Sequence, residues 1–217
     1  ETAAIEAGYA IECDVQLAAD GEAVVFHDFT LDRLTQATGR LDALDAASLA
    51  RIAMRGTADR ILNLRDWLGL VAERTPAVIE IKSGFVGDLA LTRRVVDVVA
   101  SHAGPFALKS FDPLVVRTLR EIAPDMARGI IAMNDYEYED YARVSAAEKR
   151  ALANLLHFPD TRPDFLSWRV GDLPSAAPFL CRYELGLPLI TWTVRTEQDR
   201  ALARAHADQM VFEGFRP

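Results

Sequence analysis

The chain has 217 residues, half of them hydrophobic, which is enough to build a substantial core in one large domain or two small ones. Its formal net charge of -8 argues against a broad basic surface for nucleic acid, although one small positive pocket could still hold a phosphate group. No run of about 18 apolar residues is present, so we expect no membrane-spanning helix.

The first residue is Glu1 rather than a methionine, which leaves open a natural start or a signal peptide upstream. The opening stretch, ETAAIEAGY, predicts a helix that ends near Gly8. The two cysteines, Cys13 and Cys181, make no disulfide framework and are predicted to be buried thiols. Such cysteine usage favours a reducing compartment, and we expect the protein in the cytoplasm.

Seven apolar runs rich in β-formers predict strands along the chain. In order they are AIECDVQ, PAVIEIKS, PFALKSF, MARGIIAM, DFLSWRV, LPLITWTV and QMVFEGF. An eighth, shorter run, VVFHD, is joined to the first through Asp20 and Gly21, which predicts a hairpin.

Amphipathic stretches alternate with these runs and predict helices. They are LNLRDWLGLVAE, GDLALTRRVVDVVASHA, DPLVVRTLREIA, PSAAPFLCRYEL and TEQDRALARAHA. Repeated strand-then-helix order predicts parallel strands joined by crossovers, and therefore an α/β domain. Residues 134–163, which include the acidic, tyrosine-rich NDYEYEDY, break this order and predict an inserted, partly helical excursion.

A closed parallel barrel needs eight strands, one more than the seven barrel-type runs. We therefore predict a (β/α)8 TIM barrel that forms one domain over residues 1–217 and is incomplete at its N-terminus. Its first strand would lie upstream of Glu1, and a small hairpin would follow its second strand. An open doubly wound sheet is the alternative, but the glycine-rich phosphate turn that often accompanies that fold is not evident.

Acidic residues interrupt the first two predicted strands. Glu12 and Asp14 lie two residues apart, so both side chains point to one face, about 6.6 Å apart along the strand. Glu80 repeats the pattern on the next strand, with Lys82 two residues further on the same face. Because buried carboxylates repel one another, a cation is needed, and clustered oxygen ligands suit Mg²⁺ or Ca²⁺ better than zinc.

A structural interpretation competes with the metal site. Glu80 and Lys82 could form an ordinary ion pair within the strand. A lone histidine such as His27 is also more often structural than catalytic. However, His27 ends the VVF run directly after the E-x-D hairpin, which strengthens the case for a catalytic role.

The stretch IECDVQLAADGEAVVFHDFTLDRLT, followed by IEIKS, LKSFDP and ITWTV, resembles the glycerophosphodiester phosphodiesterases. Their pattern runs E-x-D-V-x-x-x-x-D-G-x-x-V-x-x-H-D-x-x-L-x-R-x-T, with E-I-K later. The resemblance implies a barrel enzyme that hydrolyses glycerophosphodiesters to sn-glycerol 3-phosphate and an alcohol at the C-terminal face of its strands. It further implies one divalent cation held by Glu12, Asp14 and Glu80. His27 would be one of two acid/base histidines, and Lys82 would help to hold the phosphate.

Two elements of the family pattern are missing. The family's first strand carries H-R-G, with the second histidine and a phosphate-binding arginine, and an E-N-T-like segment follows it. We expect both upstream of Glu1; the alternative is a chain that has lost half of its catalytic pair. His102, His157 and His206 are predicted to lie at solvated surface positions rather than to replace the missing histidine.

Two aromatic residues are candidates for the substrate pocket. Trp192, at a predicted strand end, and Phe111, after LKS, are positioned to line a glycerol site, although a core position is the alternative for each. Arg195 replaces the asparagine of the family's W-T-V-N and would contact the variable alcohol or remain solvated.

Two other functions stay open beside the phosphodiesterase. A related barrel enzyme of sphingomyelinase D type shares the E-x-D and histidine arrangement but acts on choline phospholipids, and no membrane-docking loop is evident here. A non-catalytic barrel could bind a phosphorylated ligand through the same metal site. An upstream H-R-G would favour an enzyme.

Overall fold

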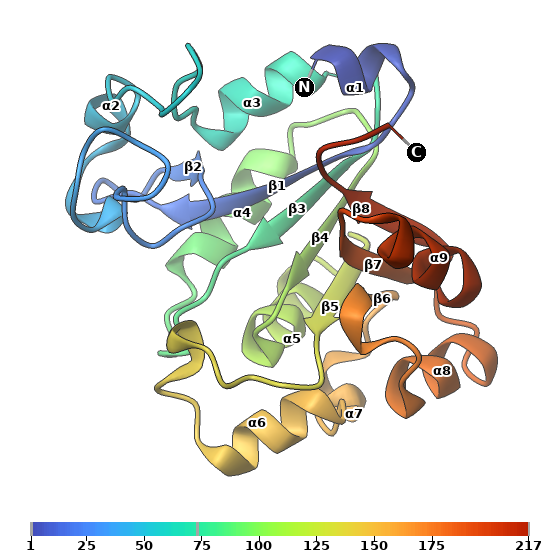
Figure 1. Cartoon of the computed structure of the whole chain (residues 1–217). Helices are drawn as coiled ribbons and strands as arrows, with labels where there is room; N and C mark the ends of the chain where they lie inside the picture. Colours follow the sequence, from blue (N-terminus) through green and yellow to red (C-terminus); the bar gives the residue numbers. More distant parts are fainter. Residues whose placement is uncertain (1, 73, 217) are drawn as a thin grey trace. The chain divides into compact units, whose positions relative to one another are not determined.

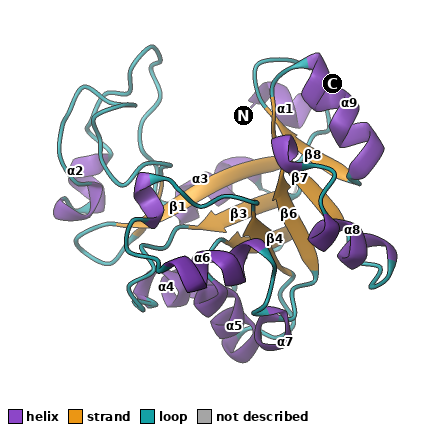
Figure 2. Ribbon diagram, turned by 60° about the horizontal axis from the view of Figure 1, so that its bottom comes forward, coloured by secondary structure: helices purple, strands orange, loops and turns teal. Residues whose placement is uncertain are grey.

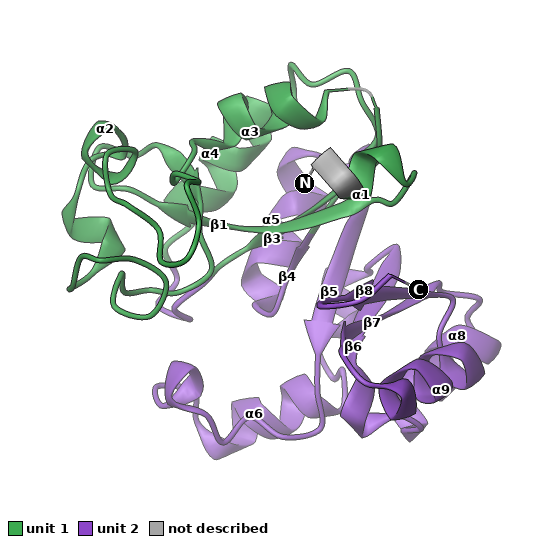
Figure 3. Ribbon diagram, turned by 45° about the horizontal axis from the view of Figure 1, so that its top comes forward, with its two compact units in different colours: residues 1–82, 88–108 green, residues 83–87, 109–217 purple. Residues whose placement is uncertain are grey.

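The computed structural model describes residues 2–72 and 74–216, and the chain divides into two compact units (Figure 3). Unit 1 comprises Glu1–Lys82 and Asp88–Leu108, and unit 2 comprises Ser83–Gly87 and Lys109–Pro217. In each unit, parallel strands alternate with helices, which confirms the predicted mixed α/β fold (Figure 1).

Unit 1 is built on a short sheet with the strand order β2-β1-β3-β4. Its strands are β1 (Ile11–Leu17), β2 (Ala23–Val25), β3 (Ala77–Ile81) and the first residues of β4 (Phe106–Ser110). β2 runs antiparallel to β1, with Val25 opposite Val15, so the predicted hairpin is confirmed. β3 runs parallel to β1 and places Glu80 opposite Asp14.

The helices of unit 1 are α1 (Thr2–Glu6), α2 (Ala46–Leu49), α3 (Leu64–Val71) and α4 (Ala90–Val99), with a 3-10 turn over Leu41–Ala43. α3 begins at Asn63, whose side chain accepts a hydrogen bond from the Asp66 main chain and so caps the helix. The connection from β2 to α3 is mostly loop and turn (Figure 2). It has a small apolar core of its own, centred on the fully buried Leu31 and Leu49.

Unit 2 continues with the strand order β4-β5-β6-β7-β8. Its further strands are β5 (Arg128–Ala132), β6 (Phe165–Arg169), β7 (Leu189–Val194) and β8 (Gln209–Phe212). β5, β6, β7 and β8 pair in parallel, each with the next. The seven predicted barrel strands and the hairpin strand are therefore all present in the described chain.

The helices of unit 2 are α5 (Pro113–Ile122), α6 (Ala146–Ala153), α7 (Phe158–Thr161), α8 (Ala176–Tyr183) and α9 (Glu197–His206). Two 3-10 turns, Glu139–Tyr141 and Val170–Asp172, follow β5 and β6. α6, α7 and the first of these turns make up the partly helical excursion predicted for residues 134–163. Asp112 caps α5 by accepting from the Leu114 main chain, and Pro113 occupies the first turn.

Three other predictions can be compared with the structure. Cys13 and Cys181 are both buried and free, as expected. No helix within residues 2–72 and 74–216 is long and apolar enough to cross a membrane. The single domain over residues 1–217 and the strand upstream of Glu1 stay predictions.

Candidate metal centre and active site

Three carboxylates converge on one face of the unit 1 sheet. Glu12 and Asp14 extend from β1, and Glu80 extends from β3, where the parallel register sets it opposite Asp14. One oxygen from each carboxylate lies within 4.8 Å of the others. In the described part of the chain, this is the one cluster of three or more acidic, histidine or cysteine side chains close enough to share an ion. The structure thus brings together the three predicted metal ligands.

Lys82 lies against two of these carboxylates. Its Nζ is 2.8 Å from Asp14 Oδ1 and 2.8 Å from Glu80 Oε1. Burial lowers the pKa of Lys82, but the negative charges of Glu80 and Asp14 outweigh burial and raise that pKa above its usual range. The ammonium group is therefore charged, and the alternative interpretation of Glu80 and Lys82 as an ion pair is also correct.

The donor set of this cluster suits a cation as well as Lys82. Carboxylates this close repel one another, and a bound cation relieves the repulsion. Carboxylate oxygens are also the donors that hard divalent cations prefer. The residues present therefore fit a divalent cation of the Mg²⁺ or Ca²⁺ type.

His27 lies just after β2, beside the strand that carries two of the acids. The Phe26 N–H donates to the Asp14 carbonyl (2.9 Å), and the buried Gln16 amide donates to the His27 carbonyl (2.9 Å). These two bonds fix the main chain at His27, while its imidazole remains 55% exposed. The catalytic candidate is thus rigidly attached to β1 and open to a ligand.

Asp28 and Arg33 orient the His27 ring. His27 Nδ1 is 2.7 Å from Asp28 Oδ1, and the Arg33 guanidinium donates to both Asp28 oxygens at 2.7 and 2.6 Å. The hydrogen bond from Arg33 lowers the pKa of Asp28, although burial opposes it. Because an ionised carboxylate only accepts, Nδ1 must carry the proton, and Nε2 is left as the basic nitrogen. Neither residue is among the predicted site residues, although the H-D-x-x-L-x-R pattern contains both.

Phe111 and Trp192 lie together in unit 2. Phe111 follows β4 and Trp192 lies in β7; their ring centroids are 5.4 Å apart and the rings are nearly perpendicular. The Trp192 indole N–H donates to the Ser167 carbonyl (3.1 Å). Both rings pack against a buried cluster that includes Tyr136 and Tyr141, yet both remain partly exposed. Phe111 and Trp192 thus each pack against the core on one side and remain accessible on the other.

Histidines outside the motif differ from expectation. His157 precedes α7, and burial lowers its pKa to about 4, so the expected solvated position is wrong. The ring lies against α7, with Nδ1 3.3 Å from the Thr161 hydroxyl oxygen, and α7 itself packs against α5. His102 is likewise half-buried, with its Nε2 enclosed and without a hydrogen-bond partner.

Arg195 pairs with Glu213 at 2.6 Å, and both side chains are largely exposed.

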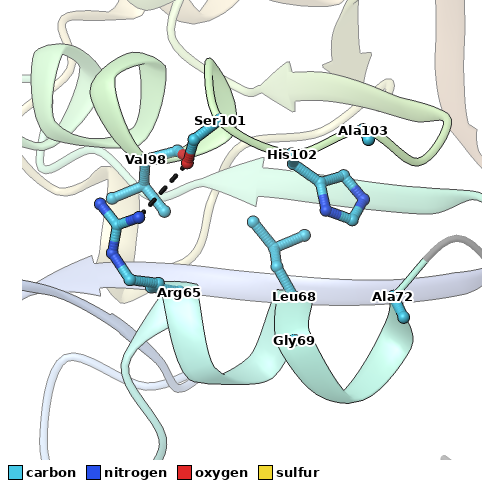
Figure 4. Close-up of a pocket in the computed structure, with 8 residues that line it drawn as sticks. All are labelled: Arg65, Leu68, Gly69, Ala72, Val98, Ser101, His102 and Ala103. Atoms are coloured by element: carbon cyan, nitrogen blue, oxygen red, sulfur yellow. Dashed lines mark hydrogen bonds between the residues drawn. The ribbon is translucent and has the colours of Figure 1, made fainter.

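A surface groove of about 350 Å³ lies between α3 and α4 in unit 1 (Figure 4). It is lined by Arg65, Leu68, Gly69, Ala72, Val98, Ser101, His102 and Ala103. Arg65 donates to the Ser101 hydroxyl at 3.3 Å, the bond drawn dashed in the figure. The groove contains none of the predicted site residues, so the candidate chemistry lies elsewhere.

Comparison with known proteins places these features in one family. A model described as "Glycerophosphoryl diester phosphodiesterase family" matches residues 2–212. A glycerophosphodiester phosphodiesterase of Caldanaerobacter subterraneus subsp. tengcongensis is 29% identical over 132 residues, which cover 56% of this chain and 54% of that protein. The match therefore spans about half the length of that relative.

Solved structures show the same fold. A phosphodiesterase of Oleispira antarctica, in complex with the product sn-glycerol-3-phosphate, has a TM-score of 0.78 at 18% identity and matches 97% of this chain and 83% of its own. A glycerophosphodiester phosphodiesterase of Thermotoga maritima has a TM-score of 0.71 at 22% identity, with 97% and 84% covered. The likeness confirms the TIM-barrel fold class of the prediction. The chain belongs to the glycerophosphoryl diester phosphodiesterase family.

Proposed function

We propose that this protein is a phosphoric diester hydrolase that converts glycerophosphodiesters to sn-glycerol 3-phosphate and an alcohol with the help of one divalent cation. The observation that carries the proposal is the cluster of Glu12, Asp14 and Glu80, with Lys82 in contact with two of the three. Family membership supports the reaction type. The cytoplasmic location expected from the sequence stays a prediction.

The charged residues of unit 1 have two roles toward the phosphate: the carboxylates bind the cation, and the lysine binds a phosphate oxygen. Glu12, Asp14 and Glu80 hold Mg²⁺ or Ca²⁺, which neutralises the diester charge and polarises the phosphoryl oxygen when bound. Lys82 adds a compact positive charge for a phosphate oxygen, since an ammonium binds phosphate as a point charge. Its raised pKa keeps that charge throughout the neutral range.

His27 moves a proton. With its Nδ1 proton held by Asp28, the free Nε2 accepts a proton from the attacking hydroxyl group or, once protonated, gives one to the leaving alkoxide. Arg33 keeps Asp28 ionised and so preserves this tautomer.

In unit 2, we assign Phe111 and Trp192 to the carbon skeleton of the small-molecule substrate. Their partly exposed rings form a perpendicular pair, which offers apolar surface to glycerol carbons. The Trp192 indole is already bonded to a main-chain carbonyl, so this side chain is held in one orientation.

Product analysis with the full-length protein tests the proposal. Incubation with glycerophosphocholine and Mg²⁺ or Ca²⁺ should release sn-glycerol 3-phosphate and choline in equal amounts. Asp14→Asn should lose most of this release, whereas Asp97→Asn, which changes an exposed acid on α4 of the same unit, should retain it. Binding of the diester without release would identify a non-catalytic barrel, and release of choline from sphingomyelin instead would identify an enzyme of sphingomyelinase D type.

A further inference from the structure

One arginine and one aspartate fasten the end of β6 in unit 2. Arg169 is the last residue of β6, and Asp172 ends the 3-10 turn that follows. The Arg169 guanidinium donates to both Asp172 oxygens, at 3.0 and 2.6 Å. The Asp172 carboxylate is only 7% exposed. Such a two-pronged pair fixes direction as well as distance.

The same two side chains also hold the segment that follows β5. Asp172 Oδ2 accepts a hydrogen bond from the Asn134 main chain at 2.7 Å. The third nitrogen of Arg169 donates to the Tyr138 hydroxyl. Residues 134–138 are therefore held at one end by the turn that follows β6 and at the other by the last residue of β6, and we call this set of contacts the β6 clamp.

The clamped segment supports the aromatic side chains assigned to the substrate. Tyr136, buried within it, contacts Tyr141 at 4.9 Å between ring centroids. Tyr141 contacts Phe111 at 5.8 Å, and Phe111 contacts Trp192. Trp192 is in turn the register partner of Arg169 across β6 and β7. The contacting aromatic rings thus run from Tyr136, in the clamped segment, to Trp192, which lies beside Arg169.

A second clamp with the same parts lies at the opposite end of the strands. Arg182 of α8 donates through two nitrogens to Asp208, which precedes β8. Asp208 also accepts from the Leu189 main chain at 2.8 Å, at the first residue of β7. In TIM barrels, residues at the C-terminal ends of strands carry function, whereas those at the N-terminal ends carry stability. Both clamps consist of an arginine–aspartate pair and a main-chain donor, but they lie at opposite ends of the strands, and Asp208 is 42% exposed where Asp172 is 7% exposed.

We propose that Arg169 is a positioning residue for substrate binding: through Asp172 and Tyr138 it holds the segment that supports Phe111 and Trp192. The Arg182 clamp serves stability only. The inference rests on the proposed function, because it assigns a role in binding the same substrate. Arg169 itself touches no reacting atom.

Steady-state kinetics on Arg169→Met and the matched Arg182→Met variant test the assignment. Both changes remove a two-pronged pair and leave an aspartate behind, so both should lower the melting temperature. Only Arg169→Met should also raise KM for glycerophosphocholine, by about tenfold with kcat nearly unchanged, as expected when uniform substrate binding is lost. Arg169→Lys should give an intermediate KM, because one ammonium group cannot replace the two parallel hydrogen bonds of the guanidinium.

Tyr138→Phe provides a second variant that spares the fold. Its side chain is 49% exposed, and the change removes only the hydroxyl group that Arg169 contacts. We expect KM to rise by about threefold without a change in melting temperature. Unchanged KM values in Arg169→Met and Tyr138→Phe, with an active wild type, would overturn this inference alone. An inactive wild type would overturn the proposed function and this inference with it.

Discussion

His27 shows how an exposed side chain acquires a defined chemical state. More than half of the imidazole is open to solvent, so packing does not orient it. The Asp28 carboxylate does so instead, and Arg33 fixes the carboxylate in turn. Surface ion pairs contribute little to stability on average. We therefore expect the contacts of Asp28 with His27 and Arg33 to matter chiefly because they hold the proton on His27 Nδ1.

Replacing His27 by alanine tests that role. If His27 transfers protons, turnover should fall by about 10²-fold or more, which is the usual contribution of one acid/base group. The measurement is kcat on glycerophosphocholine, with His206→Ala on α9 as a control that should retain activity. Near-normal turnover of His27→Ala would return this histidine to a structural role.

His157 makes a separate prediction about stability and pH. Burial lowers its pKa in the folded state to about 4, below the ordinary value of 6.5. As the pH falls below about 6.5, the unfolded chain binds a proton first, so the free energy of unfolding decreases until about pH 4. The loss attributable to this side chain is up to about 3 kcal/mol.

Chemical denaturation between pH 8 and pH 4 measures this effect. His157→Gln should flatten the decrease over that interval, since glutamine does not titrate. If the free energy of unfolding falls equally with pH in the wild type and the variant, His157 is not responsible for the decrease.

At the scale of single elements, β5 and β6 approach each other closely at one point. Gly129 lies opposite Phe165 in the parallel register. A Cβ atom at Gly129 would lie 2.3 Å from the Phe165 ring, far inside contact distance. The glycine is therefore required by packing rather than by backbone conformation.

Gly129→Ala should destabilise the protein by about 1–3 kcal/mol, the usual cost of overpacking a core. Adding Phe165→Leu should recover part of the loss. Gly69→Ala is the matched control: this position lies within α3, and a Cβ there meets nothing within 4 Å. The control should be neutral or gain up to about 1 kcal/mol from helix propensity. Equal stability of Gly129→Ala and wild type would contradict the packing account.

The elements themselves could be predicted, but their contacts could not. Runs such as AIECDVQ and PAVIEIKS form strands because apolar β-formers dominate them, and the acids within them predict the carboxylate cluster from sequence alone. The contact of Lys82 with Asp14 depends on the register between β1 and β3, which local sequence does not specify. The packing of α7, which directly follows His157, against α5 similarly joins helices far apart in the chain.

The β6 clamp lay beyond sequence reasoning for the same reason. Arg169 and Asp172 are three residues apart and read as a local pair, but the partners that give them a role, Asn134 and Tyr138, are more than 30 residues away. Only the return of the chain from β5 to β6 brings them together. Trp192 and Phe111 could be named from their strand ends, whereas the tyrosines that support them could not.

At the scale of the whole molecule, the negative charge of the chain is unevenly compensated. The formal net charge is -8, and three of the acids converge in unit 1, where Lys82 contacts two of them. Bringing like charges together opposes folding unless a cation accompanies them. Binding of a divalent cation should therefore be linked to stability as well as to catalysis.

Thermal unfolding in the presence of Mg²⁺ or Ca²⁺ tests this link. A ligand that binds only the folded state at about 100 times its dissociation constant adds about 2.7 kcal/mol, so the wild-type melting temperature should rise. Asp97→Asn should show the same rise, and Asp14→Asn should show much less. An equal rise in Asp14→Asn would place the stabilising ion elsewhere.

Chelation of the active enzyme tests the central claim most directly, which is that phosphodiester hydrolysis requires a cation held by Glu12, Asp14 and Glu80. Release of sn-glycerol 3-phosphate from glycerophosphocholine is followed before EDTA is added, after it, and again with excess Mg²⁺ or Ca²⁺. We expect EDTA to abolish the release and one of the two ions to restore it. Full activity in the presence of the chelator would contradict the claim.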